Sequence, residues 1–596
     1  MFYYMNNTEF LLLRKLNTYN FSHLNQRQIA ESMSISLGLV NKLINNLKLE
    51  GMITESLIVT EKGKDFLNCT KPKNAVILAA GYGLRMIPIN QNKPKALLSV
   101  EGKPLIERQI EHLLQVGITD ITIVVGFMKE AFEYLINKYN VNLVYNKDYS
   151  SKNNLYSAAC VLDKISNTYI VPCDLYCIKN PFNLYENFSW YMVNEIIDDY
   201  SFVRVNSNNM LNYNKNISSG NTMVGISFIS DKDSDKLVHA INSLCKNKLN
   251  DHEFWEKALF EKSDIEVVAN VVKSSDVIEI NSYEQLRELD LYSKELQNES
   301  ISVICDVFSC KNEDITNIKT LKKGMTNRSY VFTVNERKYI MRIPGEGTDQ
   351  LINRSEEANV YNAIKDKNIC DTLFYINPNN GMKISAFVEN SRCCDPYDVN
   401  DLEKSMKKLR EFHSYKLKVD HRFDIFEKID FYESLWEENS IFIDYENTKK
   451  QIYELKAFVD SVEKDICLTH IDAVPDNFLF SYAENSKEEI QLIDWEYAAM
   501  QDPHVDIAMF CIYSMYKEKK YIDQLIDIYF QKKCSFTDRV KIYCYIAMCG
   551  LLWSNWCEYK RQLGVEFGEY SLMQYRYAKD YYRYAVEGIN QIGVEG

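Results

Sequence analysis

The segment Thr469-His-Ile-Asp472-Ala-Val-Pro-Asp-Asn477 decides the architecture of the C-terminal half of this 596-residue chain. Asp472 and Asn477 lie five residues apart, and Ile493-Asp494-Trp-Glu496 follows after a short hairpin-like segment. Phosphoryl transfer from a nucleotide needs such a set, because one carboxylate accepts the proton of the attacking hydroxyl while an amide and a second carboxylate hold Mg²⁺. We therefore predict that Asp472 is catalytic and that Asn477 and Asp494 are metal ligands.

Length and composition predict three or four domains with ordinary cores, since 46% of the residues are hydrophobic and 26% are charged. The net charge of -14 argues against a protein that binds nucleic acid over its whole surface. Sixteen scattered cysteines without a CxxC pair indicate reduced thiols. The N-terminus does not read as a signal peptide, and no apolar run has the length of a membrane span. We therefore expect a cytoplasmic protein.

Residues 1–72 are predicted to form a winged helix-turn-helix domain. The helices expected over 25–32 and 36–49 have helix-turn-helix spacing, with Leu39, Val40, Leu43 and Leu47 as the buried stripe, and Met52 to Thr60 reads as a wing hairpin. The segment resembles the winged-helix domains of transcription regulators. Such domains bind DNA, here through Arg27, Lys42 and Lys48, or serve as docking and dimerisation modules, and both alternatives stay open.

Residues 74–297 are predicted to be an α/β domain, because short apolar runs at 75–80, 121–125, 143–145 and 169–171 alternate with amphipathic helices. Leu78-Ala-Ala80-Gly-Tyr-Gly-Leu-Arg85 follows the first of these strands, and Lys93-Pro-Lys95 comes soon after. Gly81 and Gly83 let backbone N–H groups approach a triphosphate, and Arg85 and Lys95 supply charge for catalysis. This pattern differs from the dinucleotide fingerprint and from the P-loop.

These residues resemble sugar-nucleotide pyrophosphorylases and, more narrowly, bacterial CTP:phosphocholine cytidylyltransferases. The resemblance implies a Rossmann-like nucleotidyltransferase fold in which Asp174 binds Mg²⁺ and a second metal ligand stands in Glu279-Ile-Asn281, where Asn281 replaces the family's Asp. It further implies two sets of binding residues. The nucleotide would contact Leu78, Ala80, Gly81, Gly83, Asn146, Asn154 and Ser157. Phosphocholine would contact Tyr200, Phe254, Trp255 and Glu279, although core packing is an alternative for Phe254.

Residues 298–596 are predicted to form a protein-kinase-like phosphotransferase domain. Gly324-Met-Thr326-Asn327 reads as a loop over the ATP phosphates, and Arg342 lies on a following strand where its guanidinium can grip phosphate. Either Glu356 or Glu357 is expected as the partner of Arg342.

Four aromatic residues, taken together with the phosphoryl-transfer set, indicate a site for a quaternary amine, although core packing is an alternative for two tryptophans on one helix. Trp553 and Trp556 lie on one face of a helix, and Tyr497 and Phe567 complete the set. A trimethylammonium group cannot donate hydrogen bonds, so aromatic faces suit it. With the catalytic loop, this set resembles choline kinases; ethanolamine kinases share the fold, and aminoglycoside phosphotransferases share the catalytic loop.

The two resemblances together imply a bifunctional Mg²⁺-dependent enzyme. It would phosphorylate choline with ATP and couple phosphocholine to CTP, giving CDP-choline and pyrophosphate for phosphocholine decoration of cell-surface glycans. Ethanolamine or a related amino alcohol is the alternative substrate. A DNA-binding regulator that uses the enzyme domains as sensors is the alternative from another class.

Overall fold

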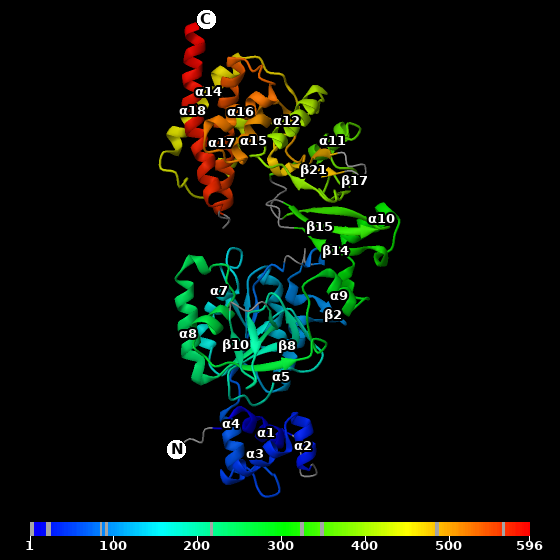
Figure 1. The fold of residues 1–596 in the computed structure, drawn as a ribbon, viewed down its shortest axis with the longest axis vertical. Helices are drawn as coiled ribbons and strands as arrows, with labels where there is room; N and C mark the ends of the chain where they lie inside the picture. Colours follow the sequence, from blue (N-terminus) through cyan, green and yellow to red (C-terminus); the bar gives the residue numbers. More distant parts are fainter. Residues whose placement is uncertain are drawn as a thin grey trace. The chain divides into compact units, whose positions relative to one another are not determined.

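The structure, a computed structural model, describes residues 5–18, 25–83, 86–89, 93–214, 219–321, 327–345, 351–482, 488–562 and 567–595. It consists of two compact units, Met1–Gln297 and Asn298–Gly596 (Figure 1). None of the helices within these ranges combines the length and the hydropathy that a membrane crossing requires.

The first unit begins with four helices: α1 (Asn7–Thr18), α2 (Gln26–Met33), α3 (Leu37–Leu49) and α4 (Glu61–Cys69). Asn25 and Ser36 start α2 and α3 by accepting hydrogen bonds from backbone N–H groups of the first turn. Ile53 and Val59 form a β-bridge where the wing hairpin was expected. Val40, Leu43 and Leu47 are buried, whereas Leu39 is exposed and does not belong to the stripe. The winged-helix assignment itself stays a prediction.

The rest of the first unit is built on a seven-stranded sheet of order β12-β8-β11-β6-β1-β4-β5. These strands are β1 (Asn74–Ala79), β4 (Ile121–Val125), β5 (Asn142–Tyr145), β6 (Thr168–Pro172), β8 (Trp190–Asp198), β11 (Gly220–Ile229) and β12 (Val268–Val272). β1 runs parallel to both neighbours. Its residues alternate between two hydrophobic cores, Ala75 and Ile77 on one face and Val76 and Leu78 on the other. Burial on both faces explains why this strand reads as one apolar run.

Five helices accompany this sheet: α5 (Leu105–Gln115), α6 (Tyr134–Tyr139), α7 (Asn154–Ala159), α8 (Asp231–Cys245) and α9 (Tyr283–Leu289). Short strands form three antiparallel pairs: β2 (Ser99–Val100) with β3 (Lys103–Pro104), β9 (Val203–Val205) with β10 (Leu211–Tyr213), and β7 (Leu175–Cys177) with β13 (Val277–Glu279). The last pair positions the site. It holds the residue before β7, Asp174, next to the end of β13, where the Ile280 N–H donates to the Asp174 carbonyl at 3.0 Å.

The second unit opens with a five-stranded antiparallel sheet of order β14-β15-β16-β18-β17. Its elements are α10 (Glu299–Phe308), β14 (Thr316–Thr320), β15 (Asn327–Val334), β16 (Arg337–Pro344), α11 (Arg354–Ile364), β17 (Leu373–Ile376) and β18 (Lys383–Ala386). The register pairs Arg342 with Ser329 on one side and with Lys383 on the other.

The remainder of the second unit is mainly helical. Its helices are α12 (Val399–Ser414), α13 (Ile425–Ser434), α14 (Tyr445–Ser461), α15 (His504–Tyr513), α16 (Lys519–Tyr529), α17 (Phe536–Gln562) and α18 (Glu569–Glu595). Short strands complete it: β19 (Arg392–Cys393), β20 (Cys467–Thr469), β21 (Phe478–Tyr482), β22 (Glu488–Leu492) and β23 (Ala499–Gln501). The long helices α17 and α18 pack against each other (Figure 1). The segment Asp472–Asn477 lies between β20 and β21, and Asp494 stands two residues after the end of β22.

Candidate active sites

The predicted catalytic loop of the second unit is held by a buried carboxylate. Asp506, at the start of α15, accepts hydrogen bonds from the backbone N–H groups of His470 and Ile471 at 3.0 and 2.7 Å. The Asn477 amide donates to the carbonyl and the carboxylate of Asp472, at 2.8 and 3.0 Å. Ile471 and Asp494 both adopt left-handed φ angles, of 68° and 66°. Such angles are costly for residues other than glycine and gather at functional sites.

Asp472, Asn477 and Asp494 line one cavity of about 400 Å³. Further lining residues, from both the sheet and the helical part, are Asn327, Arg342, Lys383, Glu496, Tyr497, Tyr513, Trp553, Trp556 and Tyr570. The structure therefore brings the predicted proton acceptor, metal ligands and aromatic residues together. Thr326 lies outside the described residues.

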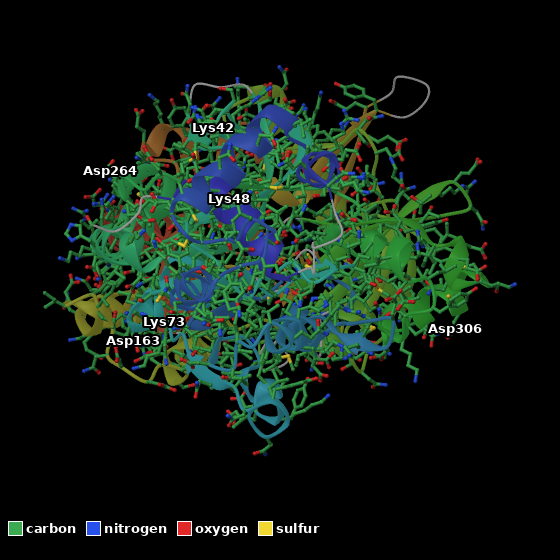
Figure 2. All side chains as sticks on the ribbon, turned by 90° about the horizontal axis from the view of Figure 1, so that it is seen from below. Lys42, Lys48, Lys73, Asp163, Asp264 and Asp306 are labelled. Carbon is green, nitrogen blue, oxygen red and sulfur yellow. The ribbon has the colours of Figure 1, made fainter. Side chains whose placement is uncertain are left out.

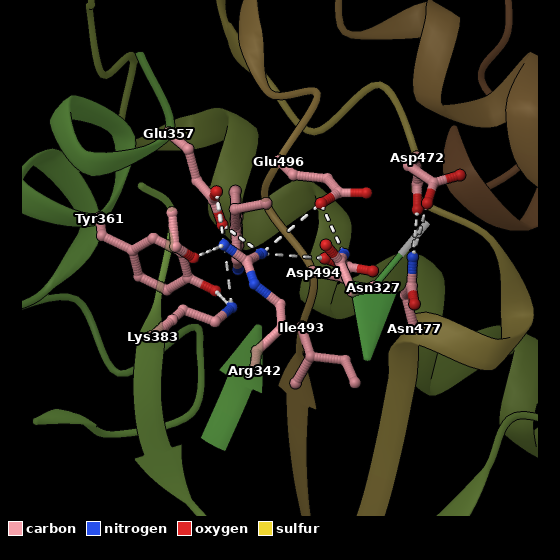
Figure 3. Close-up of polar contacts among 12 residues, drawn as sticks. Asn327, Arg342, Glu357, Tyr361, Lys383, Asp472, Asn477, Ile493, Asp494 and Glu496 are labelled. Carbon is pink, nitrogen blue, oxygen red and sulfur yellow. Dashed lines mark hydrogen bonds and ion pairs between the residues drawn. The ribbon is translucent and has the colours of Figure 1, made fainter. Parts of the chain in front are cut away.

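Arg342 is the centre of a buried charge network (Figure 3). Its guanidinium binds Glu357 through two hydrogen bonds of 2.6 and 2.7 Å. Of the two glutamates that the sequence offered, Glu356 and Glu357, the structure therefore pairs Glu357 with Arg342. The carboxylates of Glu496 and Asp494 lie 3.5 and 3.9 Å from Arg342. The Lys383 ammonium donates to the Tyr361 hydroxyl at 2.5 Å.

Sequence reasoning missed three charged residues of this network. Lys383 lies beside Arg342 only because β18 pairs with β16. Arg354 and Glu496 are joined at 3.3 Å, and Glu496 also accepts from the Asn327 amide at 2.8 Å. The sequence could have indicated Glu496, because this residue stands two positions after Asp494 in a short acidic motif.

The carboxylates of the cavity are electrostatically crowded. Burial raises the pKa of Asp472 well above its ordinary value, and the charge of Asp494 adds to this effect. Burial, followed by the charge of Glu496, raises the pKa of Asp494 to about 7. A cation bound next to these carboxylates would favour their ionised forms. This donor set therefore fits a divalent metal ion bound by Asn477 and Asp494.

The four predicted aromatic residues form a contiguous cluster. Ring centroids are 5.7 Å apart for Tyr497 and Trp553, 5.7 Å for Trp553 and Trp556, and 5.1 Å for Trp556 and Phe567. The Trp553 indole N–H donates to the Met509 sulfur at 3.0 Å, which fixes the orientation of that ring. Tyr513 and Tyr570 extend the lining and were not predicted.

A second cavity, of about 560 Å³, lies in the first unit at the C-terminal end of β1. Among its lining residues are many that the sequence singled out: Leu78, Ala80, Gly81, Gly83, Lys95, Asn154, Ser157, Asp174, Phe254, Glu279 and Asn281. Gly83 has a positive φ of 61°, as the glycine loop requires. Arg85 lies outside the described residues. Tyr82, Tyr149, Lys152 and His252 also line this cavity and were not predicted.

Lys95 joins the two predicted metal ligands of this cavity. Its ammonium lies 2.6 Å from the Asp174 carboxylate and 2.7 Å from the amide oxygen of Asn281. These residues are far apart in the sequence and meet because β7 pairs with β13.

Three of the expected nucleotide contacts, Asn146, Asn154 and Ser157, make hydrogen bonds within the protein. The Asn146 amide donates to the Ser157 hydroxyl at 3.0 Å, and the Asn154 side chain accepts from the Trp255 backbone N–H at 2.8 Å. Ser157 and Asn154 line the cavity, whereas Asn146 is buried and contacts Ser157 through its amide hydrogen bond.

Two expected phosphocholine contacts are corrected by the structure. Trp255 is 1% exposed and packs in the core against Tyr191, so its ring faces the protein interior. Tyr200 is 91% exposed in the turn after β8 and is not among the residues that line the cavity. Phe254 is 57% exposed and does line it, which removes core packing as its role.

Helix α3 carries little positive charge, because its basic residues are only Lys42 and Lys48 (Figure 2). Lys48 is paired with Glu55 at 2.6 Å, while Leu37, Leu39 and Leu49 of the same helix are exposed. DNA binding through Arg27, Lys42 and Lys48 therefore stays a prediction without further support.

Comparison with known proteins finds matches in both units. Residues 75–183 match the family model of the MobA-like NTP transferase domain, and residues 318–534 match that of choline/ethanolamine kinase. The choline-phosphate cytidylyltransferase of Streptococcus pneumoniae is 33% identical over 220 residues, which cover 36% of this chain and 96% of that protein. The 2-aminoethylphosphonate cytidylyltransferase of Lancefieldella rimae is 31% identical over 225 residues, covering 36% and 92%. Protein LicA of Haemophilus influenzae is 28% identical over 263 residues, covering 42% and 75%.

Proposed function

Because the chain belongs to the choline-phosphate cytidylyltransferase family in its middle part and its residues 318–534 match the choline/ethanolamine kinase family model, we propose that it makes CDP-choline in two steps. ATP would phosphorylate choline in the second unit. CTP would then react with phosphocholine in the first. One observation carries the proposal: a single cavity holds a phosphoryl-transfer set, Asp472, Asn477 and Asp494, together with the indoles of Trp553 and Trp556, which meet edge to face.

In the kinase step, Asp472 accepts the proton of the choline hydroxyl, whose oxygen attacks the γ-phosphorus of ATP while the bond to the β-phosphate oxygen breaks. Asn477 orients the Asp472 carboxylate through its amide hydrogen bond. Asn477 and Asp494 would hold Mg²⁺, which would supply positive charge to the phosphates. Arg342, held by Glu357, presents a fixed positive charge at the cavity wall.

Specificity for choline follows from the aromatic cluster. A trimethylammonium group offers no N–H donors, and its charge is best compensated by ring faces. The proposal therefore favours choline over ethanolamine, whose ammonium would need hydrogen-bond acceptors. Ethanolamine and related amino alcohols are the alternative substrates, and a substrate screen by mass spectrometry would distinguish them from choline.

In the cytidylyl step, a phosphocholine oxygen attacks the α-phosphorus of CTP in line, and the α–β bridging bond breaks to release pyrophosphate. The nucleophile is already an anion, so this step requires no general base. Rate enhancement then rests on orientation and on the neutralisation of charge by Lys95. Ser157 and Asn154 are proposed to contact the cytosine, and Phe254 and Glu279 the ammonium, because these four residues line the same cavity.

Paired variants test both halves in the full chain. With choline, ATP, CTP and Mg²⁺ the protein should form CDP-choline. Asp472→Ala should abolish phosphocholine formation but still convert added phosphocholine to CDP-choline. Lys95→Ala should accumulate phosphocholine and form no CDP-choline. The proposal fails if neither product exceeds a control without enzyme.

We also propose a cytoplasmic location, because ATP and CTP are found there, and transfer of the phosphocholine group to surface glycans as the use of the product. The relative that acts on 2-aminoethylphosphonate makes a phosphonate the natural competitor in the substrate screen.

A further inference from the structure

In the cavity of the first unit, the charges at the predicted metal ligands are balanced by a lysine. The Lys95 ammonium lies within hydrogen-bond distance of both Asp174 and Asn281. One positive and one negative charge face a neutral amide, so these three side chains together carry no net charge. The side chains of Lys95 and Asp174 are only 10% and 19% exposed, so water screens this balance weakly.

A divalent cation would find few ligands in this arrangement. Mg²⁺ takes about six oxygen ligands in octahedral geometry, keeps several waters among them, and is usually held by one or two carboxylates together with substrate phosphates. Asp174 and Asn281 offer one carboxylate and one amide, and Lys95 already occupies an oxygen of each. Within the described ranges, no group of three or more His, Cys, Asp or Glu side chains is placed to hold a metal ion.

We propose that Asn281 makes divalent cation binding in this domain dependent on the nucleotide. The cation arrives with CTP, whose phosphates supply the missing charge and oxygens. The Lys95 ammonium exchanges Asp174 for a phosphate oxygen, and this exchange frees the Asp174 carboxylate. This inference rests on the proposed cytidylyl transfer, because it requires a triphosphate whose oxygen replaces the Asp174 carboxylate as the partner of Lys95.

Two substitutions change this balance by one unit in the same direction. Asn281→Asp adds a carboxylate, and Lys95→Met removes the competing ammonium. Either variant gives the three side chains a net charge of minus one. An extra unit charge about 4 Å from a dication is worth well over a factor of ten in affinity, even at the effective dielectric constant of a protein surface.

Binding of Mn²⁺ alone tests the inference without any substrate. The full chain would carry Asp494→Asn throughout, which weakens the predicted metal site of the kinase unit, and Mn²⁺ would be titrated by electron paramagnetic resonance without nucleotide. Introducing Asn281→Asp or Lys95→Met should each create a Mn²⁺ site at least about tenfold tighter than in the parent protein. Adding Asp174→Asn to the Asn281→Asp protein should remove the new site.

A gain below tenfold in both variants, or tight binding by the parent, would overturn the inference. The outcome is separable from that of the proposed function. If the Mn²⁺ pattern is as expected but no CDP-choline forms from CTP and phosphocholine, the proposed reaction fails and the account of Asn281 stands. Circular dichroism of each variant shows whether a missing site reflects lost folding.

Discussion

Replacing Trp553 by Leu should weaken the kinase reaction on choline far more than the reaction on ethanolamine. The Trp553 side chain lines the kinase cavity, is 7% exposed, and makes edge-to-face contacts with Tyr497 and Trp556, with ring centroids 5.7 Å apart in each pair. A desolvated cation–π contact contributes about 2 kcal/mol, which corresponds to a factor of about 30 in kcat/KM. Ethanolamine depends less on that ring, because its ammonium can donate hydrogen bonds.

The assay is release of ADP at varied choline or ethanolamine concentration, with ATP saturating. Trp436→Leu is the matched control, since it removes an indole of the same unit that donates to the Asn555 carbonyl and does not line the cavity. The control should keep the ratio of the two kcat/KM values, and Trp553→Leu should lower it about tenfold or more. An unchanged ratio for Trp553→Leu would refute the assignment of the aromatic cluster to choline.

Three further predictions follow from other parts of the chain. Glu357→Gln should lower the unfolding free energy of the kinase unit by about 3 kcal/mol, because Arg342 loses a buried bidentate partner; urea denaturation measures this, and CDP-choline synthesis from added phosphocholine should persist. Burial lowers the pKa of His504 to about 4, below that of a histidine in the unfolded chain. The unfolded chain therefore takes up this proton first, and the free energy of unfolding is highest above about pH 6.5 and decreases as the pH falls toward 4. His504→Asn should flatten that part of the dependence of the thermal unfolding temperature on pH, and an unaltered profile would contradict this. If the N-terminal helices bind DNA, Lys42→Glu should reduce the salt-dependent shift of the chain's own promoter fragment, whereas equal shifts would exclude α3 as the contact.

The positions of both cavities could be predicted because their key residues follow strands in short motifs. Ile121–Val125 is a strand in both the prediction and the structure, and the runs at 75–80 and 169–171 overlap β1 and β6. Parallel strands that are buried on both faces give uninterrupted apolar runs, which is a strong local signal. Catalytic residues placed directly after such strands then lie at one edge of the sheet.

Contacts set by tertiary pairing could not be predicted in the same way. Lys383 reaches Arg342 through the register of β16 and β18, which the intervening segment does not encode locally. Phe254 and Trp255 are neighbours, yet one faces the cavity and the other the core. The segment that carries them has no regular period, so the sequence offers no signal for which ring points inward.

The N-terminal helices are attached to the nucleotidyltransferase sheet by more than the covalent link. Arg14 of α1 contacts the carboxylate of Glu186 at 3.3 Å, and Glu186 accepts a hydrogen bond from the hydroxyl of Tyr169, near the start of β6, at 3.0 Å. Glu186 is itself buried, and burial raises its pKa while Arg14 opposes that rise.

This contact limits how the chain can be divided or recombined. A fragment that begins at residue 74 would expose the surface that α1 covers and would leave Glu186 without its cation, next to Tyr169 of the central strand β6. Gene fusion is often pictured as joining independent modules by a neutral linker. Here the joined parts share a partly buried ion pair, so an exchange of either part between relatives would have to carry residues 14 and 186 together.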